Sequence, residues 1–92
     1  MHLEIVSPEA TLFSGDVTSV TVPGVNGEFQ VLDNHAPIVS LLQQGNVKIG
    51  GEVKIDEEYA SKFIKSTEGK TALPISSGTM EMRDNKVIVL VD

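Results

Sequence analysis

Short runs in which apolar and polar residues alternate recur along this chain of 92 residues, and turn-forming residues separate them. Alternation with a period of two is typical of a strand that buries one face. We predict strands at His2–Ser7, Val17–Val22, Glu28–Leu32, Ile38–Leu42, Val47–Ile49, Thr79–Arg83 and Lys86–Val91. Many short strands with frequent turn signals predict an all-β fold, a small β-sandwich of about ten short strands.

The C-terminal part of the chain carries the strongest hairpin signal. Asp84-Asn85 separates two strand-like runs, which predicts a two-residue turn with positive φ at both positions. The run Val87–Val91 is apolar on both faces, which favours a strand buried on both sides. In the first strand, alternation assigns Leu3 and Ile5 to the core.

The second predicted strand, Val17–Val22, has the same pattern. Val22 is expected to point inward and Thr21 outward. Gly15 before the strand and Pro23-Gly24 after it are predicted to be turns, because glycine and proline interrupt strand ladders.

Residues 56–65 break the strand pattern. They can form a short helix with Asp56 as its N-cap and Phe63 on its apolar face. The alternative is a hairpin between Val53–Ile55 and Lys62–Ile64. The sequence leaves both open.

Charge and composition narrow the classes of function. The net charge is −6, and no Lys or Arg precedes Lys48, so binding to a phosphate backbone is disfavoured and a basic protein surface is a better partner. There is no cysteine to form a disulfide or a thiolate metal site. No apolar run approaches the ~18 residues that span a bilayer, and the N-terminus lacks a signal-peptide pattern. We expect a soluble cytoplasmic chain, or one attached to a larger assembly.

Few residues suggest chemistry. Gly69-Lys70-Thr71 resembles the end of a phosphate-binding loop, but the required earlier glycine is missing, which favours a surface turn. His35 is the only internal histidine, and it lacks the partners of a metal site or of a catalytic nucleophile. It is expected either to bond to the backbone of its turn or to contact a partner. We expect no catalytic, cofactor or metal site.

Glu28 follows Gly27 after a glycine-framed turn, beside Phe29. An isolated acid at such a tip is well placed to meet a basic group on a partner. A solvated turn acid is the alternative.

Three segments resemble a known family: Ile5–Gly15 (IVSPEATLFSG), Pro23–Val47 (PGVNGEFQVLDNHAPIVSLLQQGNV) and Ile75–Asp92 (ISSGTMEMRDNKVIVLVD). They are similar to the N-terminal β-sandwich domain of the epsilon subunit of F-type, proton-translocating ATP synthases. The resemblance covers more than half of the chain, and the Asn-His-Ala-Pro corner makes it specific.

The resemblance implies a non-catalytic role in the rotor. Such a subunit binds the gamma subunit and the polar loops of the c-ring, and it acts indirectly on the alpha-beta hexamer. The resemblance places Val25, Asn26, Gly27 and Glu28 against the c-ring loops, and the c-ring loop of the family carries an arginine. It places Ser7 and His35 near gamma. The implied location is peripheral, through the complex, on the cytoplasmic face of the bacterial inner membrane.

Two alternatives to a rotor subunit remain. One is a free-standing β-sandwich module that binds a small ligand, although four aromatic residues are few for a pocket lining. The other is a small hydrolase that uses His35. We expect residues 1–92 to form one domain, without the two-helix C-terminal domain of typical members.

Overall fold

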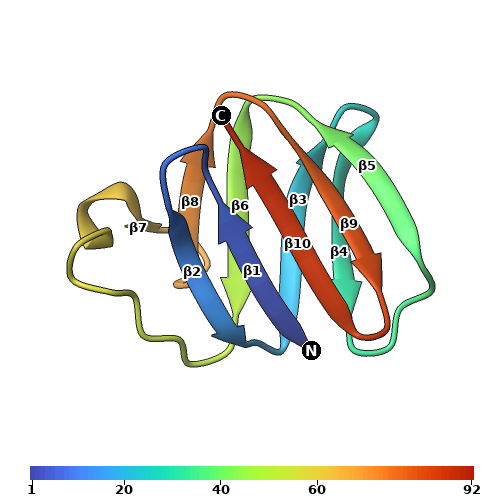
Figure 1. Cartoon of the computed structure of the whole chain (residues 1–92), viewed down its shortest axis with the longest axis horizontal. Coiled ribbons are helices and arrows are strands. Elements are labelled where there is room, and N and C mark those ends of the chain that lie inside the picture. Colours follow the sequence, from blue (N-terminus) through green and yellow to red (C-terminus); the bar gives the residue numbers. More distant parts are fainter.

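A computed structural model of residues 1–92 shows ten strands and one 3-10 turn, which confirms the all-β prediction (Figure 1). The strands are β1 (His2–Val6), β2 (Thr11–Asp16), β3 (Ser19–Gly24), β4 (Gly27–Leu32), β5 (Ile38–Leu42), β6 (Gly45–Gly50), β7 (Ile64–Lys65), β8 (Thr71–Ile75), β9 (Gly78–Arg83) and β10 (Lys86–Val91). The turn η1 spans Ala60–Lys62. No helix in the chain is long and apolar enough to cross a membrane.

The strands form one strongly curled sheet that folds into two layers. The front layer has the order β2-β1-β10-β9-β5, and the back layer has the order β4-β3-β6-β8-β7 (Figure 1). The layers join through a single residue pair, Gly24 with Leu42. Two backbone hydrogen bonds close this seam, from Val25 N to Leu41 O at 3.0 Å and from Gln43 N to Pro23 O at 2.9 Å.

The core lies between the two layers and follows the predicted alternation. Leu3 and Ile5 are fully buried, as are Met80 and Met82 on β9, whereas Glu81 between them is exposed. In most strands one face therefore supplies the core, although both residues of β7 are exposed, and the sandwich has two outer faces.

The connections fall at two ends of the sandwich (Figure 1). The upper end in the figure carries the β1–β2, β3–β4, β5–β6 and β8–β9 connections and Asp92. The lower end carries Met1, the β4–β5 corner (residues 33–37) and the β9–β10 turn. The pairing agrees, because β1 runs parallel to β10 and both start at the lower end, with His2 opposite Lys86.

Several strand boundaries differ from the sequence prediction. Gly15 lies inside β2, a strand that we did not predict, and Pro23 and Gly24 end β3 instead of following it. β8 was also missed, because it contains Pro74. β7 pairs only with Thr71 and Ala72, so β8 has a free edge beside Pro74, and an edge tolerates a residue without an N–H.

Of the two predictions for residues 56–65, the short helix is present only as the 3-10 turn η1, and the hairpin with Val53–Ile55 is wrong. Asp56 accepts a hydrogen bond from Glu58 N at 2.9 Å, as an N-cap would, but only the turn η1 follows. Ile64–Lys65 pairs with the following strand β8, and not with Val53–Ile55 as the alternative predicted. Helices this short are marginal unless tertiary contacts support them. Phe63 does pack against the core as expected, but from an irregular segment.

β10 was predicted to be buried on both faces, and this is wrong. Val87, Val89 and Val91 face the core, whereas Leu90 is 50% exposed. No third layer covers the outer face of the front layer, so two side chains of the apolar run VIVLV, Ile88 and Leu90, point outward (Figure 1).

The β9–β10 turn has the predicted form, with φ of 51° at Asp84 and 58° at Asn85. Asn85 Oδ1 also accepts a hydrogen bond from Asn34 N at 2.8 Å, which ties the turn to the β4–β5 corner. The substitution Asn85→Ala should lower the free energy of unfolding by about 2 kcal/mol, because it adds left-handed strain and removes this bond. Asn85→Gly should cost only about 1 kcal/mol, since glycine adopts the backbone conformation freely. Urea unfolding measures both, and equal losses would contradict this account.

Candidate partner-binding site

The turn between β3 and β4 projects Val25, Asn26 and Gly27 from the upper end, and all three are exposed. Gly27 has a φ of +121°, which favours glycine. At Gly24 a Cβ would lie 2.9 Å from Gly27 O, so this tight turn requires glycine at its first position as well. The bond from Val25 N to Leu41 O fixes the tip to β5. The tip is therefore an exposed feature with a defined position.

Glu28 lies in β4, just beyond the tip, opposite Pro23. Its side chain is 54% exposed, and Oε2 lies 3.3 Å from Lys48 Nζ. Lys48 also contacts Glu68 Oε1 at 3.1 Å. The hydrogen bond from Lys48 to Glu68, and to a smaller extent the one to Glu28, raises the pKa of Lys48. The same bond from Lys48 lowers the pKa of Glu68. Glu28 thus has a basic neighbour within its own chain, which sequence reasoning missed.

His35 lies in the exposed β4–β5 corner at the lower end. Its Nδ1 is 2.7 Å from Ala36 O, and its backbone N donates to Leu32 O at 3.2 Å. Asp33 pairs with the N-terminal ammonium of Met1 at 2.6 Å, which holds the corner against β1. The ring therefore bonds to its own turn, and no group of three or more His, Cys, Asp or Glu side chains is placed to hold a metal ion.

Ser7 lies at the upper end, in the turn between β1 and β2. Ser7 N donates to Ala10 O at 2.8 Å, and Ala10 N donates to Ser7 O at 3.3 Å. The structure therefore separates Ser7 from His35, which lies at the lower end (Figure 1). Both residues border the front layer, Ser7 after β1 and His35 before β5.

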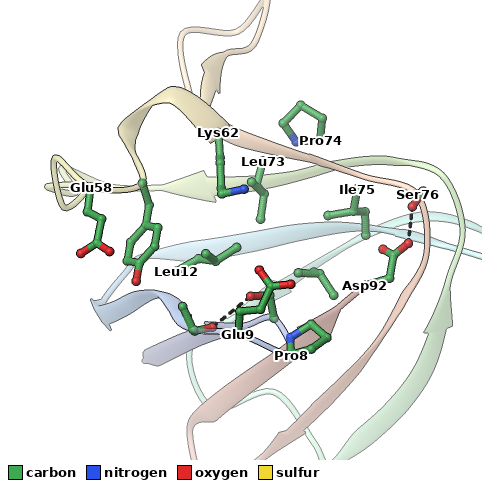
Figure 2. Close-up of a pocket in the computed structure, with 14 residues that line it drawn as sticks. Pro8, Glu9, Leu12, Glu58, Lys62, Leu73, Pro74, Ile75, Ser76 and Asp92 are labelled. Atoms are coloured by element: carbon green, nitrogen blue, oxygen red, sulfur yellow. Dashed lines mark hydrogen bonds between the residues drawn. The ribbon is translucent and has the colours of Figure 1, made fainter.

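A groove of about 590 Å³ runs beside Ser7, between the β1–β2 turn, β8 and the 58–62 segment (Figure 2). Leu12, Leu73 and Ile75 supply apolar walls, and Ser76 donates a hydrogen bond to the Asp92 carboxylate at one end. This bond lowers the pKa of Asp92. Tyr59 is the single aromatic lining residue, and burial raises its pKa. The groove lacks the aromatic lining that a sugar-binding or metabolite-binding pocket typically has.

The outer face of the front layer carries an apolar patch. Leu41 on β5 is 62% exposed, Val39 is 72% exposed and Leu90 on β10 is 50% exposed. Thr79 lies between Leu41 and Leu90 in the ladder, and Val6 of β1 lies on the far side of Leu90. We call this patch the outer apolar face: Val6, Val39, Leu41, Ile88 and Leu90. Sequence reasoning assigned these residues to strands but not to a surface, although the two-sided apolar run in β10 was a signal.

One histidine does lie near a hydroxyl, but it is His2 and not His35. Ser14 Oγ is 3.3 Å from His2 Nε2, and Asp16 Oδ1 is 3.5 Å from His2 Nδ1. Glu4 Oε2 lies 3.6 Å from the same Nε2 as the serine. The side chain of Asp16 is 92% exposed, so water competes for its contact with the ring. Activation of a hydroxyl relies on a buried carboxylate that orients the imidazole, and this cluster does not provide one.

Comparison with known sequences shows what the whole chain resembles. Residues 1–92 match the family described as ATP synthase, Delta/Epsilon chain, beta-sandwich domain. The chain is 42% identical over 92 residues to the ATP synthase epsilon chain of Campylobacter fetus and spans 60% of that relative. It is 40% identical over 87 residues to that of Campylobacter curvus, with 92% of this chain and 67% of the relative covered.

The ATP synthase epsilon chain of Chlorobium limicola is 33% identical over 90 residues, with 98% of this chain and 86% of that relative covered. A chain in the central stalk and c-ring structure of the Tetrahymena thermophila mitochondrial ATP synthase superposes with a TM-score of 0.71 at 14% identity, covering 98% of this chain and 61% of that one. The structural likeness supports the fold, and the sequence matches confirm the resemblance. The chain belongs to the family of beta-sandwich domains of ATP synthase delta/epsilon chains.

Proposed function

We propose that this chain is the β-sandwich domain of an ATP synthase epsilon subunit, a non-catalytic part of the central stalk. It binds the gamma subunit with the outer apolar face and rests on the polar loops of the c-ring with the β3–β4 tip. In this way it helps to couple proton translocation to ATP synthesis in the alpha-beta hexamer. Its place is peripheral, on the cytoplasmic face of the bacterial inner membrane.

The outer apolar face is the observation that carries the proposal. Val39, Leu41 and Leu90 are at least half exposed, and Leu41 on β5 and Leu90 on β10 lie on either side of Thr79 on β9. Contiguous exposed apolar side chains typically mark a surface that a partner covers. A chain of this size also buries a smaller share of its surface than a larger domain, so it gains stability from a partner.

Gamma is the proposed occupant of this face because of where Ser7 and His35 lie. The family resemblance associates both residues with gamma, and they border the front layer at its upper and lower ends. A single elongated partner that lies along the outer apolar face would reach both. Their separation in the structure is therefore compatible with one interface.

The tip offers a second, separate surface. Val25, Asn26 and Gly27 project from the upper end, and Glu28 faces away from the core on the back layer. Two partners can therefore bind at the same time, one on each surface. The net charge of −6 favours a basic loop as the second partner, mainly by steering its approach.

Reconstitution tests the proposal. The purified chain should co-elute with the gamma subunit of its own synthase in size-exclusion chromatography. The resulting pair should bind the c-ring in lipid nanodiscs, and the chain alone should show no ATP turnover. A folded chain that elutes separately from gamma would refute the proposal.

Charge reversal at Glu28 tests the tip. Glu28→Lys should weaken binding of the gamma complex to the c-ring about tenfold, because it replaces an attraction with a repulsion toward a basic loop. Binding to gamma should not change. Glu57→Lys is the matched control, since Glu57 is exposed on a different segment and lies outside both surfaces. Surface plasmon resonance on immobilised nanodiscs measures the affinity of each variant relative to wild type. Equal losses of affinity in both variants would argue against a local role of Glu28.

A further inference from the structure

Three charged residues from separate elements meet on the outer face of the back layer. Lys48 on β6 lies 3.3 Å from Glu28 on β4 and 3.1 Å from Glu68 in the turn before β8. The side chain of Lys48 is 19% exposed, whereas those of Glu28 and Glu68 are 54% and 55% exposed. One ammonium is therefore shared by two carboxylates that solvent, or a partner, can reach.

The strand arrangement makes this sharing possible. β3 lies between β4 and β6, with Thr21 opposite Lys48 and Pro23 opposite Glu28. Lys48 therefore reaches Glu28 across β3, and Thr21, although it faces outward as predicted, is only 8% exposed.

The second carboxylate also has a fixed position. Ser66 Oγ accepts hydrogen bonds from Glu68 N at 3.3 Å and from Lys70 N at 3.2 Å. Gly69 N donates to Ser66 O at 2.9 Å, which closes the turn that carries Glu68. Lys48 thus has two alternative partners, and it can keep one contact if the other is lost.

We propose that Lys48 occupies, in the free chain, the place beside Glu28 that an arginine of the docking partner takes, and that Lys48 then pairs with Glu68 alone. Lys48 and Glu68 would in this way set how strongly Glu28 attracts the partner. This inference rests on the proposed function, because it assigns a control element to the same docking tip.

The geometry favours a guanidinium over an ammonium as the incoming group. An ammonium offers Glu28 the same point-like contact that Lys48 already makes. A guanidinium can give two parallel N–H bonds to one carboxylate, so it gains an additional bond in the exchange.

The charges give predictions of opposite sign for two substitutions. The three side chains carry a net charge of −1, from two carboxylates and one ammonium. Lys48→Met leaves a net charge of −2 on the remaining side chains and removes the ammonium that competes for Glu28. Binding of the gamma complex to the c-ring should therefore tighten about three- to tenfold at low salt. Glu68→Gln leaves a net charge of zero and removes the second carboxylate partner of Lys48. Binding of the gamma complex to the c-ring should therefore weaken by a similar factor.

The binding experiment compares wild type, Lys48→Met, Glu68→Gln and the control Lys54→Met by surface plasmon resonance on c-ring nanodiscs at two salt concentrations. Lys54 is exposed on another segment, so its substitution should change affinity less than twofold. If Lys48 only stabilises the turn that carries Glu68, Lys48→Met lowers the melting temperature and leaves the affinity for the c-ring unchanged or weaker. This result overturns the inference. If wild type does not bind at all, the proposed function fails instead.

A second measurement does not depend on the synthase. N-acetyl-arginine amide is titrated into the labelled free chain while NMR follows the Lys48 Cε resonance and the Glu28 and Glu68 carboxyl carbons. Displacement predicts shifts at Lys48 and Glu28 that N-acetyl-lysine amide at the same concentration produces more weakly. Equal responses to the two amides, or none, overturn the exchange.

Discussion

Replacing Leu41 with glutamate should reduce affinity for the gamma subunit at least about a hundredfold while leaving the fold intact. Leu41 is 62% exposed on the outer apolar face, so the free chain loses little core packing. In the proposed complex the new carboxylate would be removed from water without a partner, which typically costs several kcal/mol. Isothermal titration calorimetry with purified gamma measures the loss.

Ile64→Glu is the matched control for this experiment. Ile64 is also an exposed aliphatic side chain, at 46%, but it lies on β7, the last strand of the back layer, four positions from β5 in the strand order. Its substitution should leave gamma affinity within about twofold. If Leu41→Glu binds gamma as wild type does, another surface must form the gamma interface.

Replacing Gly78 with alanine should lower the free energy of unfolding by about 3 kcal/mol. A Cβ at Gly78 would lie 2.3 Å from Leu90 O, a backbone atom of the neighbouring strand. Gly78 also pairs with Leu42 of β5, so β9 is hydrogen-bonded on both sides and cannot shift freely. The clash would therefore strain its pairing with β10 and β5. Overpacking at a fixed backbone position costs about 1–3 kcal/mol and sometimes more. For a domain of this size the melting temperature should fall by more than about 10 °C.

Gly15→Ala is the comparison that separates this clash from a general cost of replacing strand glycines. A Cβ at Gly15 would approach only the ring of Phe13, at 3.2 Å, and a side chain can move a few tenths of an ångström. Neither glycine has a positive φ, so backbone strain does not differ between the two substitutions. Gly15→Ala should change stability by less than about 1 kcal/mol. A large loss at Gly15, or none at Gly78, would contradict the packing argument.

The strands that were predicted well are those with strict alternation and clear turn residues. Ile38–Leu42 and Lys86–Val91 have the observed bounds, because an Asx residue or a glycine turn lies close to their ends. β2 does not follow from the local pattern, because a glycine such as Gly15 is typical of a turn, whereas pairing with Leu3 of β1 holds Gly15 in the ladder. Whether a glycine ends a strand is decided by tertiary pairing, which a local pattern does not contain.

The candidate surfaces were predictable only in part. The exposed tip of Val25, Asn26 and Gly27 follows from local turn chemistry, and the structure has it. The contact of Glu28 with Lys48 depends on β3 lying between β4 and β6, and sequence spacing does not reveal that order. The outer apolar face likewise depends on β5, β9, β10 and β1 being neighbours with nothing above them. The assignments of Ser7, His35 and Glu28 to particular partners stay predictions.

The one-residue seam between Gly24 and Leu42 gives the sandwich an uneven stiffness. Within each layer, rows of hydrogen bonds resist stretching, but only two such bonds cross from one layer to the other at this seam. A sideways force on the front layer would therefore reach the back layer mainly through interlocked side chains in the core. Resistance to shear should accordingly depend on how well those side chains fill the interior, so a cavity there would loosen the mechanical link before it unfolded either layer.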